Sequence, residues 1–207
     1  MVTPAGTQNS APPLADFQNW NELDVAAKLS EHLDLSWISQ GRFSTQFANP
    51  ATYLSGLELN AGIGPHLVVS PSCFYLAFKN PAGKEGHFQV PILAVTGKQT
   101  WGRWTISDRN RLMGAIDGGN NFWAYLNRPR IDYSVGRGSW HMSTFAWDEM
   151  FYFSVFHGWT RNRFAVGARK AFTKNIAADI YYLRQDDARS QLHDFNGLGA
   201  ALEVRIR

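Results

Sequence analysis

The segment from Arg161 to Arg169 alternates between two kinds of side chain. Charged or small residues occupy one parity and apolar residues the other: Arg161, Arg163, Ala165, Gly167 and Arg169 against Phe164, Val166 and Ala168. A period of two over this length is that of a β-strand with one polar and one apolar face. Aromatic residues crowd the stretch just before it, in 151–159. Arginines on one face, apolar residues on the other and aromatics at the rim predict a strand of a membrane β-barrel.

The same alternation recurs along the chain from Trp20 to the C-terminus. It is cleanest at the end, where Leu198, Ala200, Leu202, Val204 and Ile206 share one parity. We count about eleven strands, and because closed bacterial barrels usually have an even number we favour twelve, with ten as the alternative. The prediction is an all-β, antiparallel up-and-down transmembrane β-barrel forming a single domain over 16–207, after a flexible tail in 1–15 that is rich in Pro, Ala, Ser and Thr.

The composition separates this fold from three other classes. Aromatic content is 14% and mean hydropathy is −0.28, and no apolar run reaches the roughly 18 residues of a transmembrane helix. A soluble barrel of the lipocalin type would show the same parity with its faces exchanged. We disfavour it because lysine avoids the strand centres and so many strands would enclose more volume than these side chains fill. The net charge of +3 comes from isolated basic residues, which argues against a nucleic-acid surface.

The lengths of the connections orient the barrel. Short turns are predicted near residues 31, 63, 98, 137 and 174, and longer loops near 47, 82, 117, 156 and 189. Periplasmic turns are short and external loops long in bacterial outer-membrane barrels, so the first set is expected in the periplasm. The expected location is therefore the bacterial outer membrane, with its lipid as a partner. Residues 1–6 have no secretory signal pattern, and we expect such a signal to have been removed.

Pro91 predicts a bulge or break in its strand.

Tryptophans are predicted to form two membrane-interface belts. The periplasmic belt would contain Trp101, Trp104 and Trp140, and the external belt Trp123, Trp147 and Trp159.

Charged residues on the opposite parity are predicted to line the lumen. Glu149 is flanked by arginines of neighbouring strands at cross-strand pairing distance, and the arginine fork binds carboxylates bidentately. The predicted charge ladder consists of Arg103, Arg109, Arg111, Arg128, Arg130, Asp132, Glu149, Arg161, Arg163, Asp179 and Glu203.

Several of these residues stand in short motifs that resemble a known family. The motifs are Arg109-Asn110-Arg111, Arg128-Pro129-Arg130, Asp148-Glu149-Met150-Phe151-Tyr152, Trp159-Thr160-Arg161-Asn162-Arg163 with Gly167, and Tyr182-Leu183-Arg184-Gln185. They are similar to those of the "domain of unknown function 2490" proteins. The resemblance implies an outer-membrane barrel of Gram-negative-type bacteria, without an activity to carry over. The chain departs from the family pattern at Gln89 and Pro91, and in ending with Arg207 where such barrels carry an aromatic residue.

Three functions remain in competition. A narrow arginine-lined lumen would favour passage of a small anionic solute. Interleaved acids would instead let Arg–acid ladders plug the lumen, in a structural barrel that associates with other outer-membrane or periplasmic proteins. A lipid-modifying enzyme is disfavoured, because His141 and Ser143 lie about 7 Å apart along one strand and Glu149 much farther. No metal site is expected from six scattered histidines, and no cofactor is expected.

Overall fold

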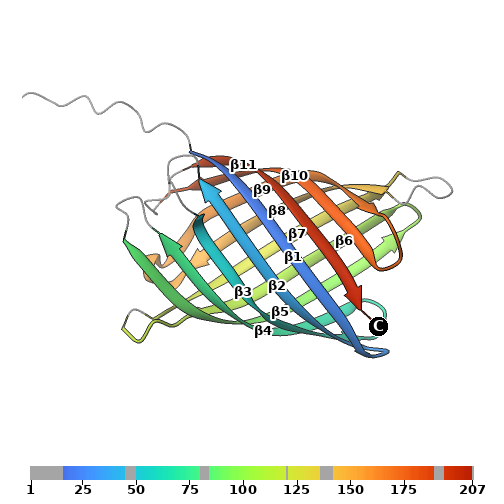
Figure 1. Ribbon diagram of the computed structural model, residues 1–207, viewed down its shortest axis with the longest axis horizontal. Helices are drawn as coiled ribbons and strands as arrows, with labels where there is room; N and C mark the ends of the chain where they lie inside the picture. The colour runs from blue at the N-terminus through green and yellow to red at the C-terminus, as the bar shows by residue number, and fades with distance from the viewer. Residues whose placement is uncertain are drawn as a thin grey trace, which may run out of the picture.

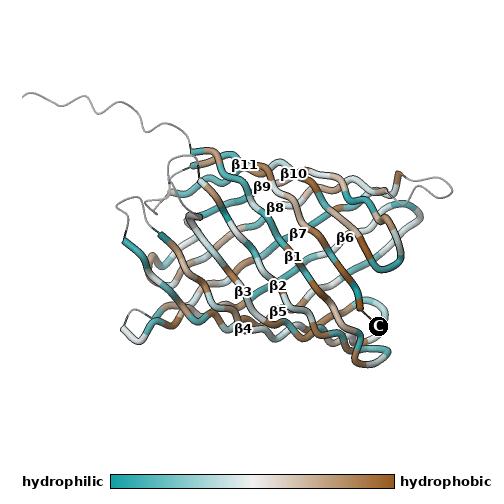
Figure 2. Tube along the Cα trace, viewed as in Figure 1, coloured by the Kyte–Doolittle hydropathy of each residue, from teal (hydrophilic) through white to brown (hydrophobic). Residues whose placement is uncertain are grey.

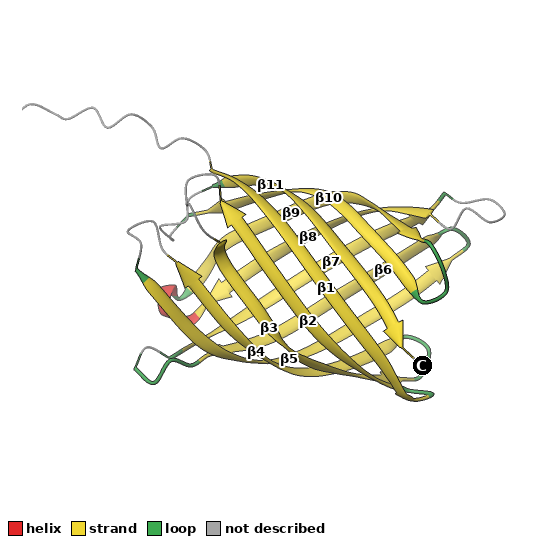
Figure 3. Cartoon of the chain, in the orientation of Figure 1, coloured by secondary structure: helices red, strands yellow, loops and turns green. Residues whose placement is uncertain are grey.

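Eleven β-strands close into a barrel (Figures 1 and 3) in the computed structural model, which describes residues 16–44, 50–79, 84–119, 121–135, 142–188 and 194–206. The strands are β1 (Asp16–Ser30), β2 (Leu33–Ser44), β3 (Pro50–Ile63), β4 (Leu67–Lys79), β5 (Glu85–Trp101), β6 (Trp104–Ala115), β7 (Phe122–Ser134), β8 (Met142–Phe153), β9 (Gly158–Ala171), β10 (Ile176–Asp187) and β11 (Phe195–Ile206). A 3-10 turn, η1 (Ser154–Phe156), connects β8 to β9. The predicted tail in 1–15 lies outside the described residues.

Each strand pairs antiparallel with the next, and the barrel closes by a parallel pairing of β1 with β11. The parallel register runs from Asp16 opposite Phe195 to Ala27 opposite Ile206. An odd number of strands requires this closure, because the first and last strands then point the same way. The all-β barrel is confirmed, and the described strand number is eleven, one below the twelve that the even-number rule favoured. As a result, β1 begins and β11 ends at opposite ends of the barrel (Figure 1).

The two ends of the barrel differ in their connections. At one end, here called the short-turn end, the turns occupy 31–32, 64–66, 102–103 and 172–175. At the other, the loop end, β1 begins and η1 lies. The turn predicted near residue 98 falls instead at Gly102 and Arg103, where Gly102 adopts a φ of 57° that a glycine tolerates without strain. Lys98 is therefore a strand residue, and its register partner on β6 is Ser107.

Apolar side chains cover most of the outward face. Hydrophobic and hydrophilic residues alternate along the strands (Figure 2). Large apolar side chains that remain exposed on the outer wall include Leu57, Leu93, Ile106, Leu112, Ile180 and Leu198. Strand β5 is the exception, because its buried residues Val90 and Ala94 are apolar and face the lumen while Gln89 and Pro91 face outward.

Pro91 interrupts one of the two ladders of β5. Its pairing with Cys73 of β4 is in continuous register. On the β6 side the ladder stops at Ile92 and resumes only at the isolated bridge between Gln89 and Ile116. The local break predicted from the sequence is thus present on the side where the missing N–H would have donated.

Part of the lumen is packed as a hydrophobic core. Trp20, Phe145, Trp147, Ala165, Leu183 and Phe195 are all buried and form one cluster. Glycines create room for it: a Cβ on Gly199 would lie 2.0 Å from the Tyr181 ring, which packs against this cluster. The β8–β1 side of the barrel is therefore filled by its own side chains.

Gly56 gives a testable measure of this close packing. A Cβ there would lie 2.2 Å from the Cys73 carbonyl oxygen and 2.6 Å from Phe74 Cα. We expect Gly56→Ala to lower the free energy of unfolding by about 1–3 kcal/mol through overpacking. Gly97→Ala is the matched control, since nothing lies within 4 Å of its added carbon. Urea titration in one detergent compares the two, and equal midpoints would contradict the expectation.

Candidate functional site: a charged lumen

The structure places the residues of the predicted charge ladder on the lumen side of the wall. Arg103 lies in the β5–β6 turn and lines a lumen cavity. The others occupy the inward parity of β6 to β11: Arg109, Arg111, Arg128, Arg130, Asp132, Glu149, Arg161, Arg163, Asp179 and Glu203.

Glu149 is the centre of this network. It is 3% exposed, and Arg163 lies directly opposite it in the β8–β9 register. Arg111 donates from its Nη2 to Glu149 Oε1, Arg163 Nη1 is 3.7 Å from Oε2, and Arg128 Nε is 3.9 Å from Oε1. Three strands thus direct arginines at one buried carboxylate, which offsets the cost of removing it from water.

A second ion pair spans four strands. Arg109 of β6 donates to Glu58 Oε2 of β3 at 2.8 Å. Glu58 lies on the inward parity of β3 and is 7% exposed, but it was not part of the predicted charge ladder. Other inward charges outside the predicted ladder include Glu22, Arg42, Arg169 and Asp187, all on the polar parity of their strands. Parity was the available signal for them.

Ion pairs also occupy the short-turn half. Arg130 binds Asp132 on its own strand through three hydrogen bonds of 2.7–3.0 Å. Arg169 donates to Asp179 at 3.1 Å and also to Glu203. Near the loop end, Arg161 Nε donates to Asp187 Oδ2 at 2.6 Å.

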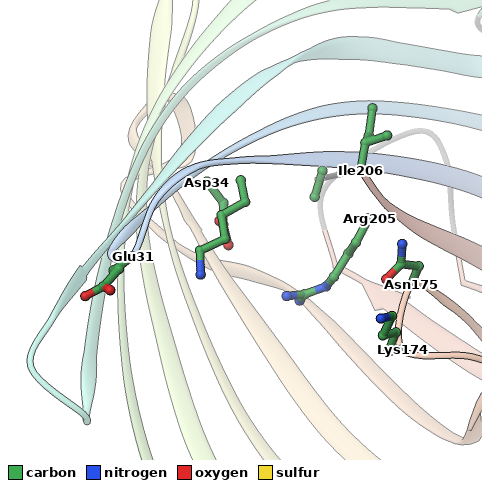
Figure 4. Close-up of a pocket in the computed structure, with 8 residues that line it drawn as sticks. Glu31, Asp34, Lys174, Asn175, Arg205 and Ile206 are labelled. Atoms are coloured by element: carbon green, nitrogen blue, oxygen red, sulfur yellow. The ribbon is translucent and has the colours of Figure 1, made fainter.

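Three polar cavities open in the short-turn half. The inner cavity, about 250 Å³, is lined by Glu58, Asn60, Val68, Ser70, Thr96, Ser107, Arg109, Arg128 and Arg130. The outer cavity, about 460 Å³, shares Thr96, Ser107 and Arg130 with it and adds Lys98, Arg103, Thr105, Asp132, Ser134, Ser143 and Arg169. A third, about 420 Å³, lies across the parallel closure and has a mixed lining that includes Glu31, Asp34, Lys174 and Arg205 (Figure 4).

Four tryptophans of the predicted belts lie exposed at the two ends of the barrel, and a fifth does not. Trp101 and Trp104 are exposed at the short-turn end, and Trp123 and Trp159 at the loop end. Trp147, predicted for the external belt, is instead 8% exposed and belongs to the lumen core. The reason is parity, since Trp147 is two residues from Glu149 on β8 and shares its inward face. Trp140 lies outside the described residues.

Polar residues in and beside these motifs, on the outward parity, bond to one another. Asn127 Nδ2 donates to Asp108 at 2.8 Å and to Asn110 at 3.0 Å. Asn162 Nδ2 donates to Asp148 at 2.7 Å. Arginines on the inward parity and amides or carboxylates on the outward parity thus make β6–β9 polar on both faces at this level.

The structure places only part of the residues weighed for an enzyme. Ser143 lines the outer cavity, and His141 is outside the described residues. Within the described ranges, no group of three potential metal ligands occurs. No helix in the described part of the chain is long and apolar enough to cross a membrane.

The chain thus forms a closed eleven-stranded β-barrel over its described residues, with an apolar outer wall and an arginine-rich lumen. The chain belongs to the family described as "Protein of unknown function (DUF2490)", whose model matches residues 17–196. The NanC porin, solved in a rhombohedral crystal form, has a similar fold with a TM-score of 0.54 at 10% identity, covering 93% of this chain and 100% of that one. OmpT, an outer-membrane protein of Vibrio cholerae, aligns at 14% identity with a TM-score of 0.43, over 77% of this chain and 52% of that one. Among curated proteins, none matches the chain.

Proposed function

We propose that the protein is an integral outer-membrane β-barrel whose narrow lumen passes small anions in preference to cations. The apolar outer wall supports the membrane location, because outward leucines and isoleucines would otherwise face water. Exposed tryptophans at both ends support it further, since such rings favour the membrane interface. The bacterial outer membrane is the location that this architecture favours.

The lining of the two connected lumen cavities carries the proposal. Six basic residues line them, namely Lys98, Arg103, Arg109, Arg128, Arg130 and Arg169, against two acidic ones, Glu58 and Asp132. An excess of fixed positive charge in a confined, partly desolvated space raises the local concentration of anions. Arginine rings act in this way in anion-selective pores.

A closed lumen is the second candidate, and the lumen core favours it. Trp20 and Leu183 are 4% and 0% exposed, which leaves no open water beside them. The Arg109–Glu58 bridge further narrows the opposite side. In this alternative the protein would be a structural barrel that associates with other outer-membrane or periplasmic proteins.

Conductance in planar bilayers separates the two candidates. A channel should give small, discrete steps with a reversal potential that indicates anion preference. Replacing Arg109, Arg128 and Arg130 together by glutamine should weaken that preference, and the difference should shrink at about 1 M salt, where the screening length falls to about 3 Å. Arg184→Gln is the control, because its side chain is on the outward parity and bonds Asp186. A folded protein that leaves the bilayer silent would contradict the channel.

A further inference from the structure

Three neighbouring strands build a compact basic array on the inner wall. In the β5–β6–β7 register, Thr96, Arg109 and Arg128 form one row, and Lys98, Ser107 and Arg130 form the next. The two rows face the inner cavity of about 250 Å³, except that Lys98 faces the adjoining outer one. Four cations and two hydroxyls therefore lie within one patch of wall.

Arg109 and Arg128 stand directly opposite each other in this array. Like charges at directly opposed positions destabilise a sheet. Arg109 is relieved by its hydrogen bond to Glu58. Arg130, the next basic residue on β7, is held by Asp132.

Within the described part of the chain, no carboxylate accepts a hydrogen bond from Arg128. Its nearest carboxylate oxygen, Glu149 Oε1, lies 3.9 Å from Nε, beyond hydrogen-bonding distance, and accepts instead from Arg111. The guanidinium is otherwise 5.5 Å from the Trp147 ring centroid. None of its five N–H groups has an acceptor among the described residues, and the side chain remains 25% exposed to the cavity.

We propose that the inner cavity is a binding site for an oxyanion group, phosphate or carboxylate in type, centred on Arg128. The guanidinium fork matches two oxygens of such a group. Ser107 and Thr96 line the same cavity and supply hydroxyl donors. A halide ion would be attracted by the positive charge, but as a single atom it would not match the directions of the guanidinium and hydroxyl donors. The solute would enter through the outer cavity, past Lys98 and Arg103, neither of which makes an ion pair with a described residue. This site deepens the proposed anion preference, yet binding does not require that the solute pass through.

Inorganic phosphate is the probe for the site. Isothermal titration of the purified protein in a zwitterionic detergent at pH 7 and low ionic strength should detect phosphate binding. We expect Arg128→Gln to weaken it at least tenfold, because the unsatisfied fork is lost, whereas Arg184→Gln should change it less than twofold. Arg128→Lys keeps the charge but not the fork, and it should also weaken phosphate binding while leaving folding, measured by heat-modifiable mobility, as in the wild type.

Three results would overturn the site: a wild-type protein that binds no phosphate, an Arg128→Gln variant that binds it as tightly as wild type, or an Arg128→Lys variant that does so. Binding with a silent bilayer would leave the site standing and remove the channel. Anion-selective conductance without phosphate binding would leave the channel standing and remove the site.

Discussion

Glu149→Ala is expected to lower the free energy of unfolding by about 3–5 kcal/mol, the cost of breaking a buried ion pair by removing one partner. The carboxylate is 3% exposed and is approached by Arg111, Arg128 and Arg163. Removing it leaves three guanidinium groups close together without the carboxylate that all three approach. Their mutual repulsion, at low effective dielectric, adds to the loss of the hydrogen bond.

Urea unfolding of wild type and variants in the same detergent measures the effect. Glu149→Gln tests charge separately from shape, and we expect it to be nearly as destabilising as alanine because an amide cannot neutralise the arginines. Glu85→Ala is the matched control, since its side chain is 79% exposed and pairs with Lys79 at 3.6 Å. Surface pairs of this kind contribute about 0–1 kcal/mol. A Glu149→Ala midpoint as close to wild type as that of the control would mean that the carboxylate is not needed to hold the arginines.

The parity of the chain predicted most of the wall, because which face a strand residue occupies is a local property. Arg161, Arg163 and Arg169 fall inward and Phe164 and Val166 outward, as the alternation indicates. The contacts across the lumen could not be predicted in this way. Arg109 and Glu58 are separated by 51 residues, and Arg111 and Glu149 by 38. Which charges form pairs depends on barrel closure and strand register, and the alternation of polar and apolar residues determines neither.

Lys98 and Trp147 illustrate two further limits. The sequence Gly97-Lys98-Gln99-Thr100 has turn composition, yet β5 continues to Trp101 because Gly102 supplies the positive φ of a tighter turn. Trp147 was assigned to a belt because tryptophan is enriched at membrane interfaces. Its parity, shared with Glu149, was the more reliable signal. Residue type indicates an average environment, whereas parity fixes the face.

Trp147→Ala should lower the free energy of unfolding by about 3–5 kcal/mol, the usual cost of removing a large aromatic side chain from a core. The ring is 8% exposed, packs with Trp20, Phe145 and Leu183, and lies under the Arg128 guanidinium. Trp159→Ala is the matched control, because that ring is 55% exposed on the outer wall and its removal leaves little buried space empty. We expect it to cost less than half as much.

The same Trp147 substitution also opens a void beside the inner cavity, so conductance in planar bilayers should rise above the wild-type level if the variant is folded. Equal losses of stability for the two tryptophans would show that the lumen core does not hold the barrel together, and unchanged conductance would mean that the constriction lies elsewhere.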